Sequence, residues 1–180
     1  MKIYNNYQGY GLISRVLHWG IAIGIIGMFA MGLWMRSLGY YHPWYHPAPE
    51  IHKMAGVILV GFMILRLFWR WINPQPDSSS LKNWERHGAS LAHAGFYVLV
   101  LLLGVSGYLL STVDGRNIDM FGLFEIPPLL VSKGLEKLAG EVHEITAYVI
   151  IALAAVHALA ALKHHFIDKD DTLRKMISGR

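Results

Sequence analysis

Histidine is the residue type in this chain with the greatest capacity for chemistry. The 180 residues include ten histidines and no cysteine. The absence of cysteine removes thiolate metal sites, iron–sulfur clusters and the thioether attachment of c-type haem. Any metal or metal cofactor must therefore be held by nitrogen or oxygen. Two imidazoles from facing helices can take both axial positions of a non-covalently bound haem iron.

Two of the histidines, His143 and His157, lie in the same apolar stretch. On a helix their spacing corresponds to about 1400°, roughly 40° short of four full turns, and to a rise of roughly 21 Å. Both side chains therefore lie on one face of the helix, at opposite depths. Such a helix can contribute one ligand to each of two sites, one near each surface of a membrane core about 30 Å thick.

Four long apolar segments must position these side chains. Hydrophobic residues make up 54% of the chain and charged residues only 16%, against about 25% charged in soluble domains. A soluble globular protein is thereby excluded. We expect membrane-spanning helices over residues 16–35, 51–72, 89–112 and 143–162, because each segment is long enough to cross the bilayer. The sequence predicts an all-α integral membrane four-helix bundle, with residues 1–180 forming a single domain.

The basic residues are distributed unevenly between the two sides of the predicted membrane fold. Eleven of the 16 lysines and arginines fall on the side that holds the N-terminus, residues 66–86 and the C-terminal tail. The positive-inside rule therefore predicts that both termini are cytoplasmic.

Depth in the membrane then groups the histidines. With cytoplasmic termini, His52 and His143 lie near the outer surface, whereas His18, His93 and His157 lie near the inner surface. The outer level has the two imidazoles that one haem iron requires. The inner level has one more than it needs, and depth alone does not say which one is extra.

Other side chains are weaker candidates for a role in binding. Lys53, Arg66 and Arg70 lie near helix ends where haem propionates or a quinone could be contacted, although snorkelling to the membrane interface explains such positions equally well. Residues 113–142 form a long connection, which predicts either a functional role or a short surface helix. We expect the other five histidines at the interface: His42, His46, His87, His164 and His165.

Four sequence motifs together are characteristic of one family. They are Arg15-Val16-Leu17-His18-Trp19, Glu50-Ile51-His52-Lys53-Met54-Ala55-Gly56, Leu91-Ala92-His93-Ala94-Gly95, and the tail from His157 to Phe166 with the following Asp168-Lys169-Asp170-Asp171-Thr172-Leu173. With these motifs the sequence resembles the bacterial cytochrome b561 family of four-helix dihaem membrane proteins. Through that family it resembles the cytochrome b subunits of membrane-bound formate dehydrogenases and hydrogenases.

The resemblance implies two non-covalent b haems and assigns their ligands. Carried over position by position, His18 and His157 hold the iron of the inner haem, and His52 and His143 hold the iron of the outer haem. The resemblance makes His93 a non-ligand near the inner haem. His93 is then a candidate to contact a quinone.

The resemblance also implies a function: electron transfer between a donor at the outer face and the membrane quinone pool, with ubiquinone as acceptor. One branch of the family oxidises superoxide, so a superoxide:ubiquinone oxidoreductase is one form of this function. The expected location is the bacterial inner membrane, as a multi-pass protein. The expected partners are membrane lipid, quinone and a small-molecule, lipid or protein donor, without nucleic acid. No catalytic nucleophile or general base is expected.

Two alternatives remain open on the sequence. The chain could be the membrane-anchor cytochrome b subunit of a larger dehydrogenase, which the sequence does not separate from a free-standing carrier. It could also be a histidine-based zinc or copper transporter, since neutral imidazole suits both metals. The interiors of the predicted spans lack the acidic residues that would accompany imidazole in a path for divalent cations, which argues against the transporter.

Overall fold

The computed structural model describes residues 2–79, 81–132 and 134–179. The chain divides into two compact units. We call them the terminal unit, made of Met1–Ala22, Phe62–Val98 and Ala152–Arg180, and the hairpin unit, made of Ile23–Gly61 and Leu99–Ile151. Lys133 and Arg180, which the count of basic residues included, lie outside the described residues.

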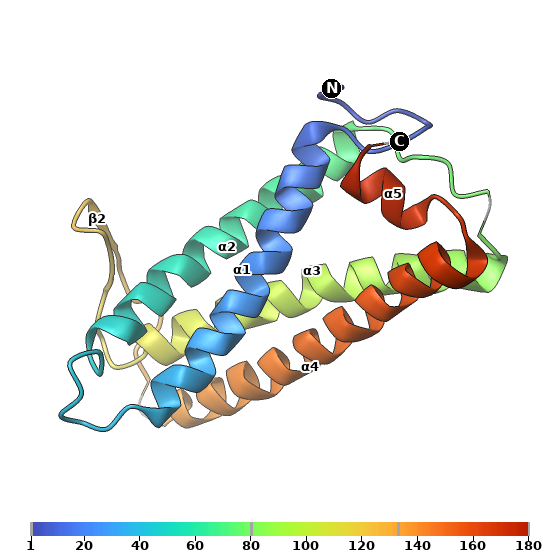
Figure 1. The fold of residues 1–180 in the computed structure, drawn as a ribbon. Helices are drawn as coiled ribbons and strands as arrows, with labels where there is room; N and C mark the ends of the chain where they lie inside the picture. Colours follow the sequence, from blue (N-terminus) through green and yellow to red (C-terminus); the bar gives the residue numbers. More distant parts are fainter. Residues whose placement is uncertain (1, 80, 133, 180) are drawn as a thin grey trace. The chain divides into compact units, whose positions relative to one another are not determined.

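Four long helices make up most of the chain (Figure 1). They are α1 (Leu12–Ser37), α2 (Pro47–Ile72), α3 (Asn83–Thr112) and α4 (Leu135–Lys163). All four are long and apolar enough to cross a membrane, which confirms the predicted helical membrane fold. Each helix contains its predicted span and extends beyond it. The largest extension is at the start of α4, where Leu135–Val142 alternates charged and apolar residues and so lacks the continuous apolar run used to recognise a span.

Local sequence signals set the helix ends. Pro47 opens α2, because its fixed φ suits a first helical turn and its missing N–H is not needed there. The same helix ends at Ile72, ahead of Asn73 and Pro74, since the residue before a proline is biased away from helical conformation. At the start of α3 the Glu85 carboxylate accepts a hydrogen bond from the backbone N–H of Lys82 at 3.0 Å, as in a capping box.

Many large apolar side chains on these helices are exposed. Ile23 on α1, Leu91 on α3 and Leu159 on α4 are each at least 65% accessible. In water this exposure would be strongly unfavourable, whereas in a bilayer these side chains meet lipid of similar polarity. The exposure is therefore what the predicted membrane environment requires.

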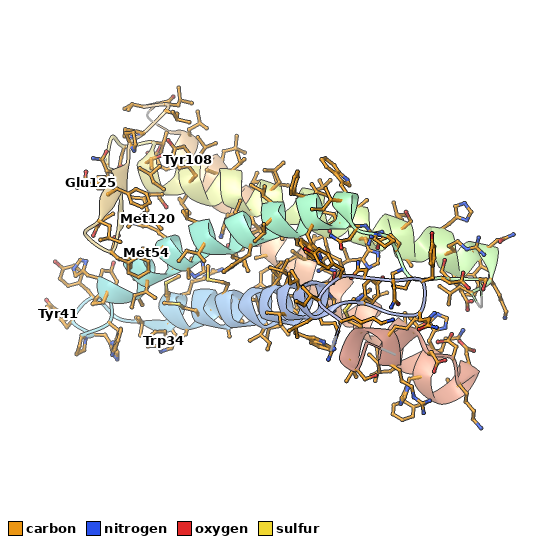
Figure 2. The ribbon with its side chains drawn as sticks, turned by 90° about the horizontal axis from the view of Figure 1, so that it is seen from above. Trp34, Tyr41, Met54, Tyr108, Met120 and Glu125 are labelled. Carbon is orange, nitrogen blue, oxygen red and sulfur yellow. The ribbon has the colours of Figure 1, made fainter. Side chains whose placement is uncertain are left out.

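A β-hairpin gives the hairpin unit its name. Strands β1 (Ile118–Met120) and β2 (Phe124–Ile126) pair in antiparallel register, with Met120 opposite Phe124. Ile118 and Met120 are buried, and Figure 2 shows the hairpin at the same end of this unit as Tyr108. The described part of the connection over residues 113–142 thus contains a hairpin and the first turns of α4, and no separate surface helix of the kind that its length suggested. Its turn uses Phe121 and Gly122 with φ of 58° and 71°, a conformation that closes short hairpin loops and is incompatible with a helix.

The C-terminal tail belongs to the terminal unit. After Lys163 the chain continues as a π-helical turn, η1 (His164–Asp168), and then as the short helix α5 (Thr172–Ile177). Figure 1 shows α5 beside the start of α1, where the Trp19 indole donates a hydrogen bond to the carbonyl of Met176 at 3.2 Å. His164, expected at the interface, is buried and contacts the Asp170 carboxylate at 2.8 Å.

Candidate functional site

In the hairpin unit, α2 and α4 bring His52 and His143 together. Their ring centres are 6.3 Å apart. Two metal–imidazole bonds of about 2.0–2.1 Å on opposite sides of one metal ion, with roughly 1.2 Å from each nitrogen to its ring centre, give a ring-centre spacing of about 6.4–6.6 Å. The two imidazoles predicted to share the outer haem therefore lie close to the spacing of such a bis-imidazole site.

The two rings differ in how their Nδ1 atoms are satisfied. Nδ1 of His143 lies 3.1 Å from the carbonyl oxygen of Leu103 and 3.2 Å from the Ser106 hydroxyl. Nδ1 of His52 is buried and has no hydrogen-bond partner among residues 2–79, 81–132 and 134–179. Burying a polar atom without a hydrogen-bond partner costs free energy. Nδ1 of His52 bears this cost, whereas Nδ1 of His143 does not.

A large cavity adjoins this histidine pair. It has a volume of about 860 Å³ and is lined mainly by apolar side chains from all four long helices. This volume is in the upper part of the range of about 300–1,000 Å³ for ligand and cofactor pockets. Gly107 in the lining accommodates an imidazole, because a Cβ there would lie 3.0 Å from Cε1 of His143. A flat, largely apolar cofactor such as haem fits the volume, the apolar lining and the paired nitrogen donors.

Three basic side chains also line the cavity, and each is paired with an acid. Lys53, a predicted site residue, contacts Glu50 at 2.8 Å. Arg36 pairs with Glu144, and Arg116 pairs with Asp114 at 2.5 Å. Hydrogen bonds from Arg116 hold the pKa of Asp114 below its usual range. The charges of all three bases are therefore compensated by the chain itself.

In the terminal unit the other three predicted histidines form one cluster. The ring centres of His18 and His157 are 6.3 Å apart, whereas those of His93 and His157 are 5.6 Å apart. The first distance equals that of the His52–His143 pair, and the second is shorter than two imidazoles on opposite sides of one metal ion would have. The spacing therefore favours His18 and His157 as the pair that would hold a haem iron from both sides. Nδ1 of His18 is buried without a hydrogen-bond partner in the described parts of the chain.

Arg66 and Arg70 lie near this cluster. The charge of Arg66 acts on all three imidazoles. Within the described ranges neither arginine forms an ion pair with an acidic side chain. Both line a small cavity of about 20 Å³ together with Tyr10, whose pKa is raised by burial. The terminal unit thus has two cations that an anionic group such as a haem propionate would compensate.

A further group with metal-binding side chains lies at the junction of α4 and η1. Ligand atoms of Glu85, His164 and Asp168 approach one another within 4.8 Å. The Lys163 ammonium lies 2.9 Å from Glu85 and 2.7 Å from Asp168. A positive charge is thus already in place between the carboxylates, so this group is best described as an ionic network that joins α3 to the end of α4.

Sequence reasoning missed several residues of the larger cavity. Arg36, Arg116 and Glu144 are charged residues at the ends of apolar segments, and the sequence offers no sign that they border one cavity. Ser106 could have been identified from the sequence, because it is a polar residue inside the third apolar span. The backbone carbonyl of Leu103 could not have been identified, because every residue has a backbone carbonyl.

Comparison with known proteins gives concordant results. Residues 9–179 match the family described as prokaryotic cytochrome b561. The chain is 44% identical to cytochrome b561 homolog 2 of Escherichia coli K12 over 179 residues, which cover 98% of this chain and 95% of that protein. It is 31% identical to cytochrome b561 homolog 1 of the same organism, over 73% of this chain and 75% of that protein.

A more distant relative comes from Yersinia pestis. It is described as the probable superoxide oxidase CybB and is 26% identical over 95% of this chain and 97% of its own length. The family match over nearly the whole chain and the identity to the first relative lead to one assignment. This chain belongs to the prokaryotic cytochrome b561 family and is a haem-binding membrane cytochrome b of electron transport.

Proposed function

We propose that this chain is a dihaem b-type electron carrier that moves electrons across the bacterial inner membrane to ubiquinone. Residues 1–180 form one functional domain with both termini in the cytoplasm. The observation that supports two haems best is the recurrence of one distance. His52 and His143 in one unit, and His18 and His157 in the other, have ring centres 6.3 Å apart.

The chain's own residues supply what such a carrier needs. A bound b haem contributes a redox centre that exchanges one electron without bond rearrangement. The four imidazoles would hold the two haem irons, and the apolar lining of the larger cavity would exclude water. Arg66 and Arg70 in the terminal unit, and Lys53 in the hairpin unit, bind propionates or the quinone. His93, left without a metal, donates a proton or a hydrogen bond to a quinone oxygen at the inner side.

The donor enters at the outer face in this proposal. The similarity to the Yersinia pestis protein described as a probable superoxide oxidase supports superoxide as a small-molecule donor. The exposed aromatic connection after α1 and the β-hairpin offer surfaces for a lipid or protein donor instead. A protein donor would make the chain the membrane anchor of a larger dehydrogenase, and a partner that copurifies would distinguish that arrangement.

The proposal predicts about two haems per chain, with a different one lost in each of two variants. His143→Ala should leave about one haem and remove one component of a redox titration. His157→Ala should also leave about one haem but remove the other component. Haem content is measured by the pyridine haemochrome assay on purified protein. The proposal fails if the wild-type chain holds one haem or none, or if both variants lose the same component.

A further inference from the structure

The two proposed haem sites differ in the hydrogen bonding of their ligands. Nδ1 of His143 lies 3.1 Å from the Leu103 carbonyl oxygen and 3.2 Å from the Ser106 hydroxyl oxygen. Ser106 itself donates to the carbonyl of Leu102 at 2.6 Å. A hydroxyl has one hydrogen, so toward His143 this hydroxyl can only accept. Both partners are acceptors, and Nδ1 of His143 must therefore carry the proton, which leaves Nε2 free to bind a metal.

Glycine at position 107 allows this arrangement. A Cβ at this position would lie 3.0 Å from Cε1 and 3.2 Å from Nδ1 of His143. Either distance is too short for an ordinary contact, so any larger side chain would push the imidazole away from its acceptors on α3. We call these three features of α3 the cradle of His143. The Leu103 carbonyl and the Ser106 hydroxyl accept from Nδ1 of the ring, and Gly107 leaves room for the ring beside the helix.

This cradle changes the electronic character of the ligand. An imidazole that donates its Nδ1 proton to an acceptor is more basic at Nε2. A more basic axial ligand favours the oxidised iron and lowers the reduction potential. The Nδ1 atoms of His52 and His18 both lack a partner within the described residues. These two ligands therefore do not distinguish the sites, and the difference lies in the acceptors of His143.

The charges around the two sites act in the same direction. The three bases that line the larger cavity are each compensated by an acid, as in the pair of Arg36 with Glu144. In the terminal unit Arg66 and Arg70 have no acidic partner among the described side chains, and the charge of Arg66 acts on His18, His93 and His157. Nearby positive charge favours the state that has gained an electron. Each b haem brings the same propionates, so haem binding does not remove this difference.

We propose that the cradle of Leu103, Ser106 and Gly107 holds the His52–His143 site at a lower reduction potential than the His18–His157 site. This inference rests on the proposed function, in which each pair holds one haem. With a haem on each pair, one electron would pass downhill from the His52–His143 site, which would be oxidised, to the His18–His157 site, which would be reduced, with no change in bonds or protons. Electron transfer from the outer donor toward the quinone is thereby favoured by the side chains around the two sites.

The test is a spectroelectrochemical titration of the purified holoprotein and its variants. The component that disappears in His143→Ala should be the one with the lower potential. Ser106→Ala should raise the potential of that component, changing its redox equilibrium by about threefold to tenfold, the size expected for one hydrogen bond. The other component should not move. Ser106→Thr keeps a hydroxyl and should restore the wild-type value.

Thr112→Val is the matched control. The Thr112 hydroxyl donates to the carbonyl of Tyr108 at 2.9 Å, so it makes the same kind of bond on the same helix without contacting His143. This variant should leave both potentials unchanged. The low-spin ferric EPR signal of the His52–His143 site should also shift in Ser106→Ala and stay fixed in Thr112→Val.

The possible outcomes separate the two proposals. Two haems with the His143-dependent component at the higher potential would overturn this inference and leave the dihaem proposal standing. The same holds if Ser106→Ala moves neither component or moves the other one. Fewer than two haems in the wild-type chain would instead overturn the proposed function.

In the terminal unit, Arg70→Gln should lower the His157-dependent potential, and an unchanged or raised value would contradict the role given to charge.

Discussion

At the scale of single residues, His93 is the histidine whose role depends most on geometry. Its ring centre lies 5.6 Å from that of His157, whereas His18 lies 6.3 Å from the same ring. Only the longer distance matches two imidazoles on opposite sides of one metal ion. In the proposed function His93 would therefore act beside a haem without being its ligand.

We predict that His93→Ala retains both haems and slows quinone reduction by at least about a hundredfold, the lower end of what a positioned proton donor contributes. Haem content and single-turnover quinone reduction are the two measurements. His87→Ala is the control, because His87 lies on the same helix and, among the described residues, its ring is hydrogen-bonded to the carbonyl of Asn83 at 2.7 Å. Loss of a haem in His93→Ala would identify His93 as an axial ligand and remove that role from His18.

At the scale of elements, the C-terminal tail is held by a small polar network. The Asp170 carboxylate accepts hydrogen bonds from the backbone N–H of Thr172 at 2.8 Å and from Nδ1 of His164 at 2.8 Å. Burial alone would raise the pKa of Asp170, but these hydrogen bonds outweigh it and hold the pKa below its ordinary value of 3.8. The network thus joins η1 to α5.

The lowered pKa sets the pH dependence of this element. Because the folded pKa of Asp170 is below the unfolded value, its stabilising effect is fully present above about pH 4. The effect is lost as the pH falls through the lowered folded value. We predict that Asp170→Asn reduces the hydrogen-exchange protection of residues 172–177 at pH 6 by about threefold to tenfold, from hydrogen bonds of about 0.5–1.5 kcal/mol.

Asp171→Asn is the matched control for the tail, because among the described residues the Asp171 carboxylate pairs with Arg174, at 3.6 Å, and not with the groups that bind Asp170. Protection in this variant should equal that of the wild-type chain once intrinsic exchange rates are corrected for pH. Equal protection in Asp170→Asn and Asp171→Asn would show that the Asp170 network does not hold α5.

At the scale of the whole molecule, the open question is what supplies the electrons. We predict that a superoxide pulse reduces the oxidised holoprotein in a stopped-flow experiment, and that ubiquinone then reoxidises it. The electron should enter through the His52–His143 site, and the His157-dependent component should be the first to accumulate in the reduced form, because it has the higher proposed potential. Reduction by a quinol analogue but not by superoxide would reverse the proposed direction and indicate a quinol-oxidising relay to a partner at the outer face.

The sequence by itself determined the membrane fold and the positions of the candidate ligands along the helices. Both follow from local properties, since apolar runs mark the spans and the helical repeat places His143 and His157 on one face. The sequence did not determine the hairpin in residues 113–142, because two three-residue strands leave little periodic signal. It also left open which of three histidines is the extra one near the inner surface.

Tertiary structure decided the features that depend on how one helix faces another. The acceptors of His143 lie 37 and 40 residues earlier in the chain, on α3, and Arg36 pairs with Glu144 across 108 residues. Such contacts depend on the rotation and depth at which packed helices meet. No local pattern encodes these quantities, because many sequences with the same apolar runs can pack at different rotations. The choice of His18 over His93 as the partner of His157 likewise rests on a difference of less than 1 Å between two ring distances, which only the packed side chains define.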